Sequence, residues 1–303
     1  MSAYPTGRGI VVGVDGSPAS TAAVRWAAQD AALHKVSLTI VHAVAPIPSA
    51  SGIWGEVPVP AGYAQWRESE AKRFVDDALH VVEQSAAEIG PVSVCTELVH
   101  GAAVPALVDF SSSADMLVVG CRGLNAASRA MLGSVSAGVV RRAHCPVAVI
   151  HDEDRTTARS GHAPVLVGID GSALSELATD IAFDEASRRG VELVALHAWS
   201  DLAELGPPAM GWSPAEWLEV HDREDHVLAE WLAARQKRYP VVAVRRLVVS
   251  GRPGHALIEN AETAQLVVVG SRGRGGFTGM LLGSVSRAVV NSVPTPVIVA
   301  RTA

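Results

Sequence analysis

The sequence predicts an α/β fold built from two tandem, open, five-stranded parallel-sheet domains of Rossmann-like type. Three observations support this. The chain has 303 residues, which is long enough for two domains of ordinary size. The string VGVDGS at residues 12–17 recurs as VGIDGS at 167–172, and LGSVS at 132–136 recurs at 282–286. Short, continuously apolar runs alternate with helical patterns, which is typical of a parallel sheet covered by helices on both faces.

The spacing of the repeated landmarks indicates where one domain ends and the next begins. His42-Ala43 recurs at His197-Ala198, 155 residues later, whereas Gly101 recurs at Gly251, only 150 residues later. Five residues are therefore missing from the second copy between these landmarks. A stretch rich in charged residues, Thr, Ser and Gly separates the copies. We predict a first domain over residues 1–152, a linker over 153–163 and a second domain over 164–303.

The elements of the first half follow one another in a regular order. A Val-rich run predicts a first strand over 9–15, and Ser17 followed by Pro18 predicts the cap and first turn of a helix that reaches residue 33. A second strand follows, then a Pro-rich loop, and then a long helix whose apolar residues recur at helical spacing. The predicted later elements are strands at 37–44, 92–99, 116–120 and 146–150 and helices at 64–88, 104–110 and 134–142. The second half repeats this order.

Composition narrows the class of protein. Hydrophobic residues make up 49% of the chain and charged residues 18%, which is enough apolar material for a core. The formal net charge is -6 and no run of Lys or Arg occurs, so we expect no nucleic-acid partner. No apolar run is long enough to span a bilayer, so no membrane partner is expected. The three cysteines are odd in number and lie in or beside apolar runs, which predicts buried or near-buried thiols and a cytoplasmic location.

Polar and glycine residues gather where two predicted strands end. Asp15 and Asp170 follow the first strand of each half, and Gly120 and Gly270 follow the fourth. Ligands of open α/β sheets bind beyond the carboxyl ends of the strands, at the point where strand order reverses. Aspartate in a D-G-S sequence is also a common turn former, and the two roles can coexist.

The glycine loops have a spacing that suits phosphate binding. Each half contains G-x-R-G, nine residues and then Gly-Ser, over residues 120–134 and 270–284. We expect the first glycines to adopt positive φ and approach a ligand closely, and Gly-Ser to open a helix whose N–H groups attract an anion. Arg122 and Arg272 add a charge-assisted contact. A glycine turn that only permits tight packing is the alternative, and the two matched copies favour the ligand.

Taken together, these motifs resemble the universal stress protein family, and the tandem arrangement is similar to two-domain members from mycobacteria. The resemblance runs from about residue 9 to residue 300. It implies the fold of the adenine nucleotide alpha hydrolases (the HUP type), with base and ribose at Asp15 and Val41 and at Asp170 and Leu196. The complete set of expected binding residues is Gly13, Asp15, Val41, Gly120, Arg122, Gly123, Gly133, Ser134 and Val135 in the first half and Gly168, Asp170, Leu196, Gly270, Arg272, Gly273, Arg274, Gly283, Ser284 and Val285 in the second.

The resemblance implies an ATP-binding regulator of stress response, persistence or growth, with up to two ATP molecules per chain, together with Mg²⁺. Enzymatic turnover is not expected as the main role, because neither loop carries the lysine of a G-x4-G-K-[ST] motif. A slow ATPase or phosphotransferase and a cyclic-AMP-binding member of the same fold are the alternatives. The last strands are expected to join the halves as an intrachain pseudo-dimer. A homodimer and a protein partner of unknown identity are further expectations.

The two loops are not identical. The second contains Arg274, Gly275 and Gly276 where the first has Leu124, Asn125 and Ala126. The second loop therefore has more conformationally permissive positions and one more cation. We predict that both sites bind and that the second binds more tightly.

Overall fold

The structure, a computed structural model, describes residues 9–46, 51–52, 55–56, 60–123, 132–151, 162–199, 214–274 and 282–302. The first half contains β1 (Ile10–Val14), α1 (Pro18–His34), β2 (Leu38–Val44), β3 (Ser51–Gly52), β4 (Gly55–Glu56), α2 (Tyr63–Ile89), β5 (Val94–His100), α3 (Ala103–Ser111), β6 (Met116–Gly120), α4 (Ser134–Arg142) and β7 (Val147–Ile150). The second contains β8 (Val165–Ile169), α5 (Ala173–Arg189), β9 (Leu193–Trp199), α6 (Pro214–Arg238), β10 (Val244–Ser250), α7 (Pro253–Ala261), β11 (Leu266–Gly270), α8 (Ser284–Ser292) and β12 (Val297–Ala300). Most of the predicted linker lies outside the described residues.

One ten-stranded sheet runs through both halves in the order β10-β9-β8-β11-β12-β7-β6-β1-β2-β5. Each half contributes five parallel strands, which confirms the predicted architecture. The halves meet where β7 pairs antiparallel with β12, with Ala148 opposite Ile298. The last strands thus pair with each other instead of remaining as open edges, and the two halves form the expected pseudo-dimer. The small β3–β4 ladder within the Pro-rich loop was not predicted.

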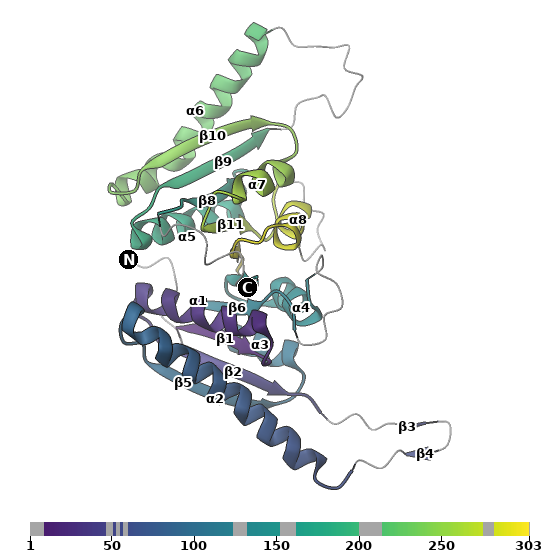
Figure 1. Cartoon of the computed structure of the whole chain (residues 1–303). Coiled ribbons are helices and arrows are strands. Elements are labelled where there is room, and N and C mark those ends of the chain that lie inside the picture. The colour runs from purple at the N-terminus through teal and green to yellow at the C-terminus, as the bar shows by residue number, and fades with distance from the viewer. Residues whose placement is uncertain are drawn as a thin grey trace.

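Helices cover both faces of the sheet (Figure 1). The alternation of side chains along each strand sends Val12 and Val118 into the core beneath α1, α2, α5 and α6, and Val11 and Leu117 into the core beneath α3, α4, α7 and α8. Each of these two cores continues across both halves of the chain. The sheet is therefore a shared scaffold, and the carboxyl ends of the parallel strands in each half are held in fixed positions.

Helix α1 begins as its sequence predicts. Ser17 has an extended backbone, and its hydroxyl accepts a hydrogen bond from the amide of Ser20, while Pro18 occupies the first turn. Ser172 caps α5 in the same way through the amide of Ser175. Both helices therefore start directly beyond a first strand and cross the face of the sheet (Figure 1), and their C-terminal parts contact each other between the two halves.

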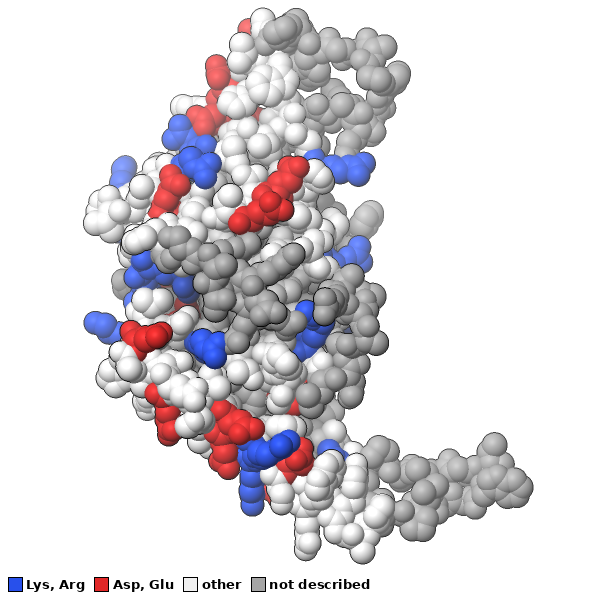
Figure 2. Space-filling model, viewed as in Figure 1, with Lys and Arg blue, Asp and Glu red and all other residues white. Residues whose placement is uncertain are grey.

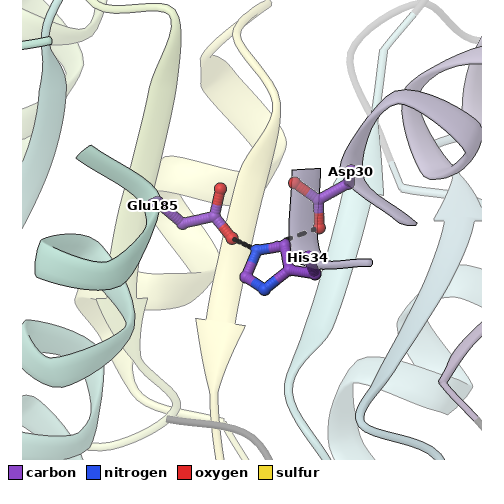
Figure 3. Close-up of side chains that lie close together, drawn as sticks. All are labelled: Asp30, His34 and Glu185. Atoms are coloured by element: carbon purple, nitrogen blue, oxygen red, sulfur yellow. Dashed lines mark hydrogen bonds and ion pairs between the residues drawn. The ribbon is translucent and has the colours of Figure 1, made fainter. Parts of the chain in front are cut away.

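A buried cluster of charged side chains joins the C-terminal ends of α1 and α5. We call Asp30, His34, Glu185 and Arg189 the interdomain charge cluster. His34 Nε2 lies 2.9 Å from Glu185 Oε1 (Figure 3). Arg189 Nη2 donates to Asp30 Oδ1 at 2.6 Å. Arg189 Nε also donates to Glu185 Oε2 at 2.9 Å. The cluster is nearly symmetric, because residues 30 and 34 of one helix correspond to 185 and 189 of the other.

The prediction of three buried or near-buried thiols is wrong for one of them. Cys121 and Cys145 are buried, whereas Cys95 is exposed. Cys95 lies on β5, which is an edge strand, and the faces of β5 and of the other edge strand, β10, are only partly covered by helices. At Cys145, burial raises the pKa of the thiol to about 12, so this side chain behaves as a small apolar residue.

Two surface observations bear on the expected partners. On the face drawn in Figure 2, acidic and basic residues are interspersed, and the described Lys and Arg residues do not gather into one broad patch. None of the helices in the described part of the chain combines the length and apolar character needed to cross a membrane.

Candidate functional site

Two pockets open at the carboxyl ends of the parallel strands, one in each half. The first has a volume of about 760 Å³ and the second about 510 Å³, both within the usual range for small-molecule sites. All nineteen residues expected from the sequence line these pockets, nine in the first and ten in the second. That these residues bind nucleotide stays a prediction. Residues 124–131 and 275–281, including Leu124, Asn125, Ala126, Gly275 and Gly276, lie outside the described residues.

The aspartate at the end of each first strand shapes its own turn. The amide of Ser17 donates to Asp15 Oδ1 at 3.0 Å, and the amide of Ser172 donates to Asp170 Oδ1 at 3.0 Å. The glycines between them, Gly16 and Gly171, have φ of +77° and +74°, a conformation that favours glycine. The turn-forming role of the aspartates is therefore observed.

The expected positive φ at the first glycines of each loop is wrong. Gly120, Gly123, Gly270 and Gly273 do not have positive φ. They are required for another reason, which is close approach. A Cβ at Gly123 would lie 2.4 Å from Asp15 Oδ2, and one at Gly273 would lie 2.2 Å from Asp170 Oδ2. Each glycine loop thus lies directly against the first-strand carboxylate.

In the second half, a hydrogen bond also joins Asp170 to the glycine loop. The amide of Arg274 donates to Asp170 Oδ2 at 3.0 Å, so one carboxylate holds the D-G-S turn through Oδ1 and the loop through Oδ2. The Arg274 guanidinium lies over the ring of Trp231 at 5.0 Å. The carboxylate therefore fixes the two segments that form the floor of the pocket.

The N-termini of α4 and α8 point into the pockets. Gly133 and Gly283 cap these helices with extended backbone, and no side chain in the described part of the chain caps their first amides. Ser136 and Ser286 tie each helix to its loop, because their hydroxyls donate to the carbonyls of Cys121 and Ser271 at 2.9 and 3.0 Å. The free helical amides and the dipole provide a site for an anion.

The second-strand histidines are held by the neighbouring first strands. His42 Nδ1 lies 2.7 Å from the Val14 carbonyl, and His197 Nδ1 lies 2.8 Å from the Ile169 carbonyl. An aromatic ring, Phe74 in the first half, packs edge-on against each imidazole. Each histidine is thus held in place by its neighbouring strand, and His197 is buried.

The long helices contribute a wall to each pocket that was not predicted from the sequence. Tyr63, Trp66, Arg67, Glu70 and Phe74 of α2 line the first pocket, while Glu224 of α6 lines the second. The spacing of three and four residues along α2 is a signal that could have identified one helical face. The direction in which this face points depends on tertiary packing, so its position at the strand ends could not be predicted from the spacing.

The described residues do not provide a protein cage for a metal in either pocket. The one group of three metal-ligating side chains that the described residues bring together is Asp30, His34 and Glu185, in the interdomain charge cluster. Magnesium usually keeps several waters and binds through substrate phosphates with one or two carboxylates. Asp15 and Asp170 are pocket carboxylates that lie against the glycine loops, so each pocket offers one carboxylate of the kind that such a magnesium ion uses.

The fold and its paired pockets define a class: a tandem α/β protein with, in each half, a helix N-terminus without a side-chain cap and a strand-end carboxylate at the pocket. A family model described as the universal stress protein family matches residues 8–151 and 162–301. The chain belongs to the universal stress protein family.

Its relatives include mycobacterial proteins of the same length. Universal stress protein Rv2623 of Mycobacterium tuberculosis is 52% identical over 301 residues, covering 99% of both chains. Universal stress protein Rv2005c of the same species is 50% identical over 293 residues, covering 97% of both. The crystal structure of a universal stress protein from Archaeoglobus fulgidus has a TM-score of 0.72 at 21% identity and covers 99% of this chain and 100% of the other, which shows the fold alone.

Proposed function

We propose that this protein binds adenine nucleotide, ATP with Mg²⁺, in up to two pockets per chain, and that it acts as a nucleotide-dependent regulator rather than as an enzyme. One observation carries the proposal. Both halves bring together the same set of groups: a strand-end aspartate, a close-packed glycine loop and an uncapped helix N-terminus that begins with Gly-Ser. This combination matches the way in which doubly wound folds hold nucleotides.

The two ends of each pocket suit the two ends of a nucleotide. Val41 and Leu196 are buried apolar residues in the middle of β2 and β9, opposite Gly13 and Gly168, and they line the pockets beside Asp15 and Asp170. The apolar side chains offer a surface for the base, and the aspartates offer polar atoms for the ribose. On the other side, the amides of α4 and α8 and the side chains of Arg122 and Arg272 offer donors for phosphates.

Regulation requires two states that differ in nucleotide affinity. Each pocket lies at the start of α1 or α5, and the same helices meet at the interdomain charge cluster. A change at one strand-end turn would therefore reach the contact between the halves through a single rigid helix. A protein partner, a homodimer and a cytoplasmic location remain part of the proposal.

Released nucleotide provides the most direct test. The purified chain is denatured, and the released small molecules are identified by mass spectrometry. A second, folded sample that has been freed of nucleotide is titrated by calorimetry. We expect an adenine nucleotide and a stoichiometry of up to two. Cyclic AMP in place of ATP would favour the cyclic-nucleotide alternative, and rapid release of phosphate would favour an ATPase. Absence of both bound and titratable nucleotide would refute the proposal.

Substitution of the loop glycines distinguishes the contributions of the two pockets to nucleotide binding. Gly123→Ala and Gly273→Ala each place a Cβ within 2.4 Å of an aspartate oxygen, so the loop must move away from its carboxylate. We expect each variant to lose one of two calorimetric sites. The larger loss of total affinity should follow Gly273→Ala, because the second loop has the additional Arg274.

The matched control is Gly254→Ala on α7, where a new Cβ would meet only Ala288 at an ordinary distance of 3.5 Å. This variant should keep both sites. Equal losses from the two loop variants would contradict the predicted asymmetry, and unchanged binding in both would contradict the site.

A further inference from the structure

Two aromatic residues establish which positions of α2 and α6 correspond. Phe74 packs against His42 and Trp231 against His197, each edge-to-face with ring centroids 5.4 Å apart. Each ring also lies where a side chain on the turn glycine would be, since a Cβ on Gly16 would meet Phe74 at 2.3 Å and one on Gly171 would meet Trp231 at 2.6 Å. Phe74 and Trp231 are therefore equivalent.

Two helical turns before these rings, the two pockets have side chains of opposite charge at equivalent positions. Seven residues before Phe74 is Arg67, and seven before Trp231 is Glu224, and both line their pockets. Glu224 Oε2 lies 3.2 Å from His197 Nε2. Arg67 is half-buried, and its guanidinium has no ion-pair partner among the described residues, because the neighbouring Glu70 pairs with Arg73 at 3.0 Å.

These two side chains lie on the base and ribose side of their pockets. Strand β9, which contains His197 and ends at Trp199, pairs with one edge of β8, whereas β11 and its glycine loop lie on the other edge. The contact with His197 places Glu224 on the β9 side of Asp170, away from the phosphate-binding loop. Arg67 occupies the equivalent position on the β2 side of Asp15.

A carboxylate and a guanidinium at a ribose edge select different ligands. A carboxylate accepts hydrogen bonds from free ribose hydroxyls, and it repels a phosphate attached there. A guanidinium donates to such a phosphate with charge-assisted, often bidentate hydrogen bonds. The first pocket is also larger, at about 760 Å³ against about 510 Å³, and so has room for the added group.

We propose that the first pocket binds an adenine nucleotide more tightly when its ribose carries an additional phosphate, and that the second binds one more tightly when its ribose hydroxyls are free. Arg67 and Glu224 determine this difference in specificity. The inference rests on the proposed adenine-nucleotide function and goes beyond it, because it assigns different ligands to the two halves of one chain.

Three probes that differ by one phosphate test the inference: AMP, adenosine 2′,5′-bisphosphate and adenosine 3′,5′-bisphosphate. Calorimetry on the full-length Gly273→Ala chain isolates the first pocket, and Gly123→Ala isolates the second. In the first pocket, we expect one of the bisphosphates to bind about tenfold more tightly than AMP. In the second pocket, we expect both to bind more weakly than AMP.

Charge-reversal variants test whether Arg67 and Glu224 determine the preference for a ribose phosphate. Arg67→Glu in the first pocket should abolish the preference for bisphosphate, and Glu224→Arg should create it in the second. The controls reverse the same charges at exposed positions of the same helices that do not line a pocket, Lys72→Glu on α2 and Glu219→Arg on α6. Affinity for AMP in each variant reports whether the pocket is still folded.

The outcomes separate the inference from the proposed function. If AMP binds but both pockets show the same ratio of bisphosphate to AMP affinity, the inference is overturned while adenine-nucleotide binding stands. The same conclusion follows if Arg67→Glu and Glu224→Arg change the ratio no more than their controls. If no adenine nucleotide binds either pocket of the wild-type chain, both proposals fail.

Discussion

Replacement of Arg189 by Met is expected to lower the free energy of unfolding by about 3–5 kcal/mol, because it leaves two buried carboxylates without their shared cation. Arg189 donates to Glu185 at 2.9 Å and to Asp30 at 2.6 Å. The side chains of both acids are fully buried, and that of Arg189 is 13% exposed. Methionine preserves much of the apolar stem, so the loss reports mainly the missing charge.

The matched control is Arg246→Met on β10. Arg246 forms a bidentate ion pair with Asp225, with hydrogen bonds of 2.8 and 2.9 Å, but both side chains are more than one-third exposed. Exposed pairs contribute at most about 1 kcal/mol, so this variant should change stability little. Urea denaturation of both variants and the wild type measures the difference. Similar losses from Arg189→Met and Arg246→Met would show that the interdomain charge cluster does not hold the two halves together.

The order of elements and the place of the pockets could be predicted because both follow from local patterns and topology. Continuous apolar runs identified the central strands, and the repeat fixed the number of domains. Once the strands are parallel, their carboxyl ends must lie on one edge, so Asp15 and the loop at Gly120 had to meet. Together with the family resemblance, which supplied Val41 and Leu196, this reasoning gave a set of residues that all line the two pockets.

Features that depend on which surfaces pack together could not be predicted in this way. Asp30 and His34 have the sequence pattern of an ordinary helix, and only the neighbouring α5 makes their position buried. The glycines at 123 and 273 were expected to need positive φ, whereas the structure shows that the aspartate oxygen occupies the space of a side chain. Cys95 was expected to be buried because it lies beside an apolar run of the sequence. Its strand, β5, is at the edge of the sheet and has only one neighbouring strand, and Cys95 is exposed.

The interdomain charge cluster should also make folding stability depend on pH, with a loss as the pH rises through neutrality. Burial and the nearby charge of Glu185 raise the pKa of Asp30 to about 7. Burial alone would lower the pKa of His34, but the hydrogen bond to Glu185 and the charge of Asp30 raise it above its ordinary value. Both groups therefore bind a proton more tightly in the folded chain than in the unfolded one.

The sign of the effect follows from proton linkage. Where the folded state holds more protons than the unfolded state, stability falls as pH rises. The contribution of Asp30 is complete below about pH 4 and is lost as the pH passes about 7, and that of His34 is lost above about pH 6.5. Glu185 acts in the opposite direction: burial would raise its pKa, but Arg189 and His34 lower it to about 2, so its contribution is lost in strong acid. Asp184, 3.6 Å from His34 Nδ1, and Arg188, which pairs with Asp184, complete the charged surroundings.

Unfolding measured by urea from pH 5 to pH 8.5 should therefore show a decrease of a few kcal/mol across the range. Asp30→Asn removes one titrating group while its amide oxygen can still accept from Arg189, so the pH dependence should become shallower and the stability at high pH should approach that at low pH. The control is Asp222→Asn on α6, whose side chain is 82% exposed and should leave the pH profile unchanged. If Asp30→Asn and the wild type have parallel profiles, Asp30 does not carry the extra proton. If both profiles are flat, the cluster keeps a single charge state across this range and cannot report pH to the contact between the halves.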